Sequence, residues 1–90
     1  MTEDLELRRR RLKYRSKHRG TKELDLLLGV FAERQLDVMS ERELDLYEAI
    51  LDADEVEIYG WLVGREAPPP AYDNDVMRRL LAFDFARALQ

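Results

Sequence analysis

Residues 24–31 read Leu-Asp-Leu-Leu-Leu-Gly-Val-Phe, and their apolar side chains recur with the period of an α-helix. A helix that repeats apolar residues at i, i+3, i+4 and i+7 presents one face to a core. The residues of this stripe are Leu24, Leu27, Leu28 and Phe31. We expect the helix to end near Asp37.

A second helix is predicted directly after it. Ser40 followed by Glu43 has the spacing of a capping box, in which the hydroxyl and the carboxylate satisfy backbone N–H groups at the helix start. Asp54 followed by Glu57 repeats that spacing, so the second helix should stop within residues 52–54 and a third should begin there. The apolar face of the second helix consists of Leu44, Tyr47, Ile50 and Leu51.

The third helix is short and apolar, and it contains Trp61. Gly64 suits the position just after its end, because glycine adopts the left-handed conformation without steric cost. Residues 68–72 form a Pro-rich connector that we expect to be extended. A C-terminal helix is predicted over residues 74–90, with Asp73 or Asn74 as its N-cap.

The N-terminal stretch, about residues 1–22, is predicted to be a basic helix from Glu3 to about Lys17 followed by a turn. No segment alternates apolar and polar residues over the length of a strand. The sequence therefore predicts an all-α fold in which residues 1–90 form one compact, single-domain bundle of four to five short helices.

The composition excludes several classes of protein. The chain has 90 residues, no cysteine and one histidine, so disulfides and thiolate chemistry are impossible and a zinc site is hard to assemble. No apolar run approaches the roughly 20 residues that span a bilayer, so we expect no membrane insertion. The acidic N-terminus resembles neither a secretory signal nor a mitochondrial presequence. A bacterial cytoplasmic protein, or a processed protein of the mitochondrial matrix, fits these features.

Charge is divided unevenly along the chain. Residues 1–22 hold nine Lys and Arg against three acids, whereas residues 23–90 hold six against sixteen. The run Arg8-Arg9-Arg10-Arg11 could bind nucleic acid phosphates. A sequence pI near 5.0 and the spread of four consecutive arginines around a helix argue against that interpretation, so we expect no nucleic acid partner.

The most unusual segment is residues 14–25, where a glycine interrupts a helical pattern among charged residues. One interpretation is an ordinary turn between two helices, in which Gly20 ends the first helix, Thr21 caps the next and the charged neighbours lie in solvent. The other is a recognition turn. Arg19 supplies a bidentate donor, Gly20 allows close backbone approach and Glu23 supplies a carboxylate, all within five residues.

This segment also resembles a known family. Arg19-Gly20-Thr21-Lys22-Glu23, continued by Leu24-Asp25, matches the RGxxE motif of the flavinylation (FAD assembly) factors of succinate dehydrogenase. Downstream, Asp52-Ala53-Asp54-Glu55 ahead of Ile58-Tyr59-Gly60-Trp61-Leu62 resembles the acidic turn and aromatic-Trp-Leu helix of that family. The resemblance covers roughly residues 8–83.

The resemblance implies a five-helix protein that binds the flavoprotein subunit of succinate dehydrogenase, or of fumarate reductase, and promotes covalent attachment of FAD to a histidine of that subunit. The chain itself would bind no cofactor tightly and no metal, and would be a monomer when free. Its partner-binding residues would be Tyr14, His18, Arg19, Gly20, Lys22, Glu23 and Asp25. Replacing Arg19 or Glu23 should weaken the complex and leave the fold nearly unchanged.

Other functions have weaker support in the residues. A generic protein-interaction module and a basic nucleic-acid-binding arm remain alternatives. An enzyme would need a poised acid, base or nucleophile, yet His18 is the lone imidazole and lies beside Lys17 and Arg19, so a surface role fits it better. The acidic residues around Asp54 lack the ligand spacing of an EF-hand. Tyr59 and Trp61 are typical of core or helix-interface aromatics, and Trp61 is expected to anchor the bundle.

Overall fold

The computed structural model describes residues 4–90, and every regular element in that range is helical. The elements are α1 (Leu5–Lys17), α2 (Lys22–Gln35), the 3₁₀ turn η1 (Leu36–Val38), α3 (Glu41–Leu51), α4 (Glu55–Leu62), the 3₁₀ turn η2 (Pro70–Tyr72), α5 (Asp75–Ala82) and α6 (Phe85–Ala88). The predicted all-α class is confirmed. The expected first helical residue, Glu3, lies outside the described residues.

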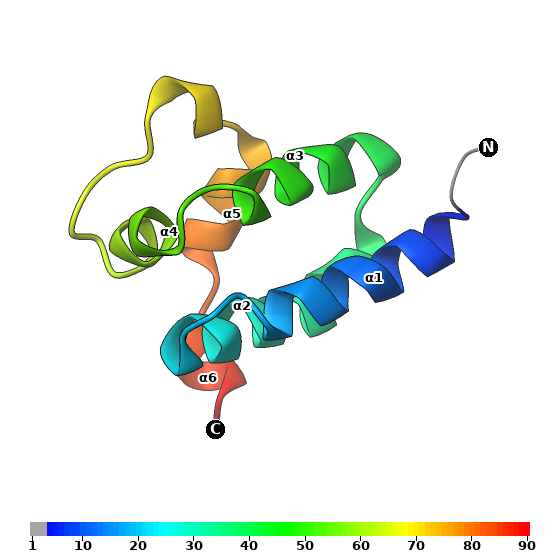
Figure 1. Ribbon diagram of the computed structural model, residues 1–90, viewed down its shortest axis with the longest axis horizontal. Helices are drawn as coiled ribbons and strands as arrows, with labels where there is room; N and C mark the ends of the chain where they lie inside the picture. The colour runs from blue at the N-terminus through cyan, green and yellow to red at the C-terminus, as the bar shows by residue number, and fades with distance from the viewer. Residues whose placement is uncertain (1–3) are drawn as a thin grey trace.

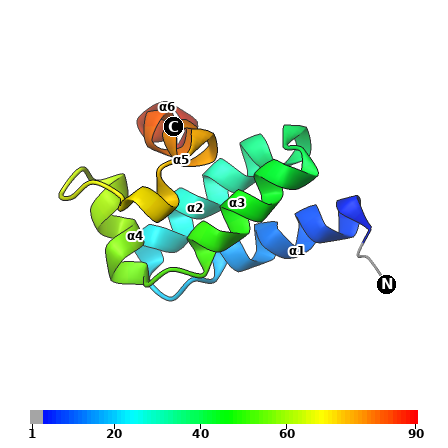
Figure 2. The ribbon, with the colours of Figure 1, turned by 90° about the horizontal axis from the view of Figure 1, so that it is seen from above.

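Helices α1, α2 and α3 run alternately up and down and lie side by side (Figures 1 and 2). Helix α1 contacts both α2 and α3, α5 packs on α3 and α4, and α6 packs on α2. The radius of gyration is 12.4 Å, which is the value of about 12 Å expected for a compact domain of this length. The α1–α2 turn and the α3–α4 turn thereby come to the same end of the molecule (Figure 1).

The core is apolar and draws on every helix except α6. Of the stripe predicted in α2, Leu24, Leu28 and Phe31 are fully buried. Trp61 is 4% exposed, and its ring centroid lies 5.1 Å from that of Tyr72, in agreement with its expected anchoring role. The other fully or nearly buried apolar residues are Leu12, Ala32, Leu36, Met39, Leu44, Tyr47, Ile50, Leu51, Ala53, Ile58, Val76, Met77 and Leu80.

The predicted helix starts are largely confirmed. Thr21 accepts from Leu24 N at 3.3 Å, and both hydrogen bonds of the Ser40–Glu43 capping box are present. Asp54 caps α4, but it accepts from Val56 N at 2.8 Å, and no reciprocal bond from Glu57 completes a box among the described residues. Gly64 follows α4 with a φ of 76°, as expected of a residue after a helix end.

The C-terminal segment differs from the prediction of one helix over residues 74–90. Asn74 caps α5 as expected, but α5 ends at Ala82 and Phe83 is extended. Asp84 then caps α6 by accepting from Arg87 N at 3.1 Å. The break lets the ring of Phe83 pack at 5.3 Å from Phe31 and 5.0 Å from Phe85. The contacts of these aromatic rings favour the break over a continued helix. The described residues thus form five longer helices and one four-residue turn of helix, α6.

The Pro-rich connector also differs in part. Pro69 is extended, as predicted, but Pro70 begins the 3₁₀ turn η2. Proline is compatible with the first position of a helical turn, where its missing N–H has no partner to lose. The turn places Tyr72 against Trp61.

Candidate functional site

The basic face of α1 is paired with acids of α3. Arg8, Arg11 and Arg15 follow the helical spacing i, i+3, i+7, and the acids opposite them have the same spacing. The pairs are Arg8–Asp45 at 2.6 Å, Arg8–Glu48 at 3.0 Å, Arg11–Glu48 at 3.0 Å and Arg15–Asp52 at 2.7 Å. Hydrogen bonds from Arg11 and Arg8 lower the pKa of Glu48.

The other side of α1 is also engaged within the molecule. The Arg9 guanidinium donates to Leu36 O at 2.9 Å and to Met39 O at 2.7 Å, while Lys13 pairs with Asp37 at 3.0 Å. Most of the positive charge that suggested nucleic acid binding is thus used to hold α1 against its neighbours.

The turn between α1 and α2 is built around one carboxylate. Asp25, in the first turn of α2, accepts from Arg19 N and from Gly20 N, the latter at 3.1 Å. Gly20 has a φ of 134°, a conformation that L side chains rarely adopt. Asp25 therefore shapes the turn from within the chain.

Arg19 links this turn to the α3–α4 turn. Its Nη2 donates to Ala53 O at 2.8 Å, and its side chain is half-buried. Its Nε is buried and has no hydrogen-bond partner in the part of the chain that the structure describes. The expected role of Arg19 in binding a client stays a prediction, but the residue also joins two loops of the free molecule.

Gly20 lies beside the end of the Glu55 side chain, at the start of α4. A Cβ added at Gly20 would lie 2.2 Å from Glu55 Oε2, well inside van der Waals contact. The Gly20 backbone therefore leaves just enough room for the Glu55 side chain, which comes from the acidic turn noted in the sequence. The RGxxE segment and the acidic turn are therefore in contact with each other.

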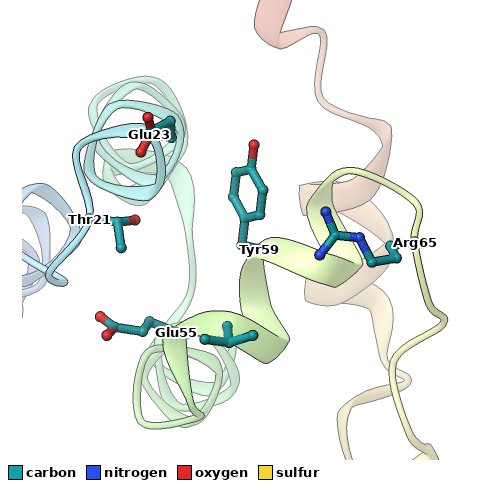
Figure 3. A pocket seen from close by; sticks show the side chains of 6 residues that line it. Thr21, Glu23, Glu55, Tyr59 and Arg65 are labelled. Atoms are coloured by element: carbon teal, nitrogen blue, oxygen red, sulfur yellow. The ribbon is translucent and has the colours of Figure 1, made fainter.

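A cleft of about 280 Å³ opens beside this contact (Figure 3). Glu23 lies on its α2 side, Glu55 near the first turn of α4, and Tyr59 between them and Arg65. The complete lining is Thr21, Glu23, Glu55, Val56, Tyr59 and Arg65. Among the seven sequence candidates only Glu23 lines this cleft.

The remaining candidates lie near the turn but outside the cleft. Tyr14 is 66% exposed and its ring centroid is 4.3 Å from that of His18, which is itself exposed at the end of α1. Lys22 is exposed in the first turn of α2. The structure thus divides the candidates into exposed groups and two half-buried residues, Arg19 and Asp25, with internal partners.

Five cleft residues were not predicted as site residues: Thr21, Glu55, Val56, Tyr59 and Arg65. Tyr59 was interpreted as a core or helix-interface aromatic, and it is half-buried and packed against the core. The signal available was the acidic turn at residues 52–55, whose nearness to Gly20 depends on how the two loops pack.

The described residues contain no group of three or more His, Asp or Glu side chains able to hold a metal ion. None of the helices described is long and apolar enough to cross a membrane. The fold and the exposed turn with its cleft define a small helical binding protein.

Comparison with known proteins identifies the family. A model described as flavinator of succinate dehydrogenase matches residues 10–84, most of the chain. The chain belongs to this family, which is one of assembly factors and not of catalytic enzymes.

Individual relatives come from bacteria and from mitochondria. The FAD assembly factor SdhE of Acetobacter pasteurianus is 42% identical over 79 residues, which are 88% of this chain and 72% of that protein. The mitochondrial succinate dehydrogenase assembly factor 2 of Drosophila grimshawi is 38% identical over 80 residues, 87% of this chain and 54% of the relative. The mitochondrial succinate dehydrogenase assembly factor 2 of Debaryomyces hansenii is 46% identical over 85 residues, which are 91% of this chain and 60% of that protein. The chain spans little more than half of these mitochondrial relatives.

Proposed function

We propose that this protein is a FAD assembly factor that binds the flavoprotein subunit of succinate dehydrogenase and promotes covalent attachment of FAD to it. The observation that carries the proposal is membership of the flavinator family over residues 10–84, combined with a folded RGxxE turn at the molecular surface. FAD belongs to the client in this proposal, and the fumarate reductase flavoprotein is a second possible client of the same kind.

The mechanism requires no active site on this chain. A protein that binds one conformer of a flavin-loaded client more tightly shifts the client toward that conformer. About 1.4 kcal/mol of differential binding gives a tenfold shift. The bond-forming chemistry then belongs to the flavin and to the client histidine.

Glu23 is the motif residue best placed to contact the client directly. It is exposed, and its side chain has no hydrogen bond or ion pair to any other residue described. Arg19, Gly20 and Asp25 instead fix the shape of the turn that presents it. We infer that the motif combines one contact residue with three residues that set backbone geometry, and that the factor acts as a monomer in the bacterial cytoplasm or the mitochondrial matrix.

The test is co-expression with a succinate dehydrogenase flavoprotein subunit in cells that lack their own factor, with covalent flavin scored by in-gel fluorescence. The wild-type chain should raise covalent flavin, and Glu23→Gln should lower it severalfold. Glu41→Gln is the matched control, because Glu41 is likewise exposed in the first turn of its helix and lies away from the cleft. Flavinylation that is the same with and without the chain would contradict the proposal.

A further inference from the structure

The outward face of α1 carries a continuous row of exposed side chains. The helical spacing i, i+3, i+7, i+11 places four residues on it, here called the outer row of α1: Leu7, Arg10, Tyr14 and His18. Leu12 and Ser16, on the opposite face of the helix, are fully buried. Figure 2 shows α1 at the edge of the bundle with no other helix beyond it. The outer row therefore faces solvent along the whole helix.

Arg10 differs from the other cations of α1 because the fold gives it no partner. Six cations of this helix bond to acids or backbone carbonyls of other elements: Arg8, Arg9, Arg11, Lys13, Arg15 and Lys17. Arg10 has no hydrogen bond or ion pair in the part of the chain that the structure describes, and Glu6, one turn earlier, does not pair with it. Its guanidinium is thus available to a carboxylate from outside the molecule.

A shallow hollow of about 380 Å³ lies along the outer row. All of its lining belongs to α1: Leu7, Arg10, Arg11, Tyr14 and Arg15. Leu7 is 51% exposed and Tyr14 is 66% exposed, and the aliphatic stems of the arginines complete an apolar floor. Sites for small molecules enclose most of the ligand, whereas a hollow on one helix is open on its outer side. It suits a side chain that a protein surface presents to it.

We propose that the outer row of α1 docks a segment of the flavoprotein client that presents an apolar side chain to the hollow and a carboxylate to Arg10. This inference rests on the proposed function and adds to it a contact surface on α1, outside the RGxxE turn.

The charges on α1 favour an acidic protein segment over a polyanion. Arg11 and Arg15, which flank the hollow, are already neutralised by Glu48 and Asp52. A nucleic acid therefore meets a single free cation here, and phosphate binding gains its strength from many. One carboxylate beside an apolar side chain matches one guanidinium beside an apolar hollow.

The outer row also leads directly into the turn that carries the motif. His18 precedes Arg19, and its ring centroid lies 4.3 Å from that of Tyr14. Helix α1 has 13 residues and is therefore roughly 20 Å long, so a client bound at the turn can continue along it without a gap. Arginine and tyrosine are also among the residue types that contribute most to binding at protein interfaces.

The experiment measures the dissociation constant for a flavoprotein subunit on which the wild-type chain has been shown to raise covalent flavin. Arg10→Ala and Leu7→Ser are each expected to weaken binding about fivefold, and Arg10→Glu more than about tenfold, because charge reversal repels a carboxylate. The affinity of Arg10→Ala should also depend less on salt than that of wild type.

Two matched controls are available. Arg34→Glu reverses another exposed arginine that is unpaired among the described residues, and Arg34 lies on α2 beside α6. Leu81→Ser changes an exposed leucine of α5, which is 41% exposed. Both controls should bind within twofold of wild type, and circular dichroism melts confirm that every variant keeps the fold.

Several results would overturn the docking surface and leave the assembly function intact. These are binding of Arg10→Glu or Leu7→Ser within twofold of wild type, or a loss on Arg34→Glu as large as that on Arg10→Glu, which would indicate an effect of overall charge. Self-association of the wild-type chain that Leu7→Ser abolishes would also overturn it, since a second copy would then cover the row. A wild-type chain without effect on covalent flavin would contradict the proposed function itself.

Discussion

At the scale of single residues, Gly20 holds a backbone conformation that disfavours any side chain. Its φ of 134° is nearly exclusive to glycine, and a Cβ would strike Glu55. We expect Gly20→Ala to lower the free energy of unfolding by about 1–3 kcal/mol, measured by urea denaturation. Gly64→Ala is the control for backbone strain alone, since Gly64 has a φ of 76° with open space around it, and it should cost about 1 kcal/mol.

The steric part of this effect can be separated. Glu55→Ala removes the carboxylate that a Cβ at position 20 would strike, so Gly20→Ala should cost less in that background than in wild type. An equal loss of unfolding free energy in both backgrounds would show that the clash with Glu55 does not contribute to the effect of Gly20→Ala.

Glu48 provides a pH-dependent prediction at the same scale. Arg11 and Arg8 lower its pKa in the folded state below the ordinary glutamate value of 4.5. Its contribution to stability is therefore fully present above pH 4.5 and is lost as the pH falls through the folded-state pKa. Glu48→Gln should cost about 1 kcal/mol at pH 7, because the carboxylate is partly buried and serves three arginines.

The measurement is urea denaturation of wild type and Glu48→Gln across the acidic range. The difference between them should shrink as the pH falls. A difference that stays constant into strong acid would mean that the interaction of the charges is not its source.

At the scale of elements, a buried hydrogen bond joins α1 to α3. The Ser16 and Tyr47 oxygens are 2.7 Å apart, both residues are fully buried, and Ser16 Oγ also donates to Leu12 O. Burial raises the pKa of Tyr47. Ser16→Ala leaves the Tyr47 hydroxyl buried without this partner and should cost about 1–3 kcal/mol.

A double-mutant cycle with Tyr47→Phe isolates the bond. The double variant should be less destabilised than the sum of the two single variants, because it removes both polar groups together. Additive losses would indicate that the two hydroxyls act independently.

The sequence predicted a helix or a helix end correctly where the signal was local and strong. The α2 stripe, the Ser40–Glu43 box and Gly64 after α4 depend on spacing within one helix or turn, and all three are confirmed. The break at Phe83 was missed because it depends on the packing of Phe83 against Phe31, a residue more than fifty positions away. The pattern of residues within one helix gives no information about such a distant contact.

The candidate site divides in the same way. Spacing within residues 19–25 indicated an exposed turn, and the structure confirms a turn there. The partners of that turn, Ala53 and Glu55, lie just before and at the start of α4, and they come into contact with it only because α1 and α3 run parallel, with α2 antiparallel to both. The cleft was therefore beyond reach of the sequence, although both of its carboxylates stand in first turns of helices.

At the scale of the whole molecule, the separation of charge along the sequence becomes a pairing in space. The excess of positive charge in residues 1–22 meets the acids of α3, so α1 offers phosphates few free cations. We expect no specific affinity for duplex DNA at physiological salt, with a dissociation constant no tighter than about 10⁻⁴ M by fluorescence polarisation.

A triple variant tests whether pairing is the reason. Changing Asp45, Glu48 and Asp52 to Asn, Gln and Asn releases Arg8, Arg11 and Arg15 without altering side-chain size. This variant, if circular dichroism shows it folded, should bind DNA more tightly than wild type, with a steeper dependence on salt because each phosphate contact releases counterions. Micromolar binding by the wild-type chain would contradict the argument, since it would show that the ion pairs with α3 open readily and that the basic helix is available to a polyanion. The acids of α3 thus decide which partners the basic helix can bind, because they neutralise its arginines.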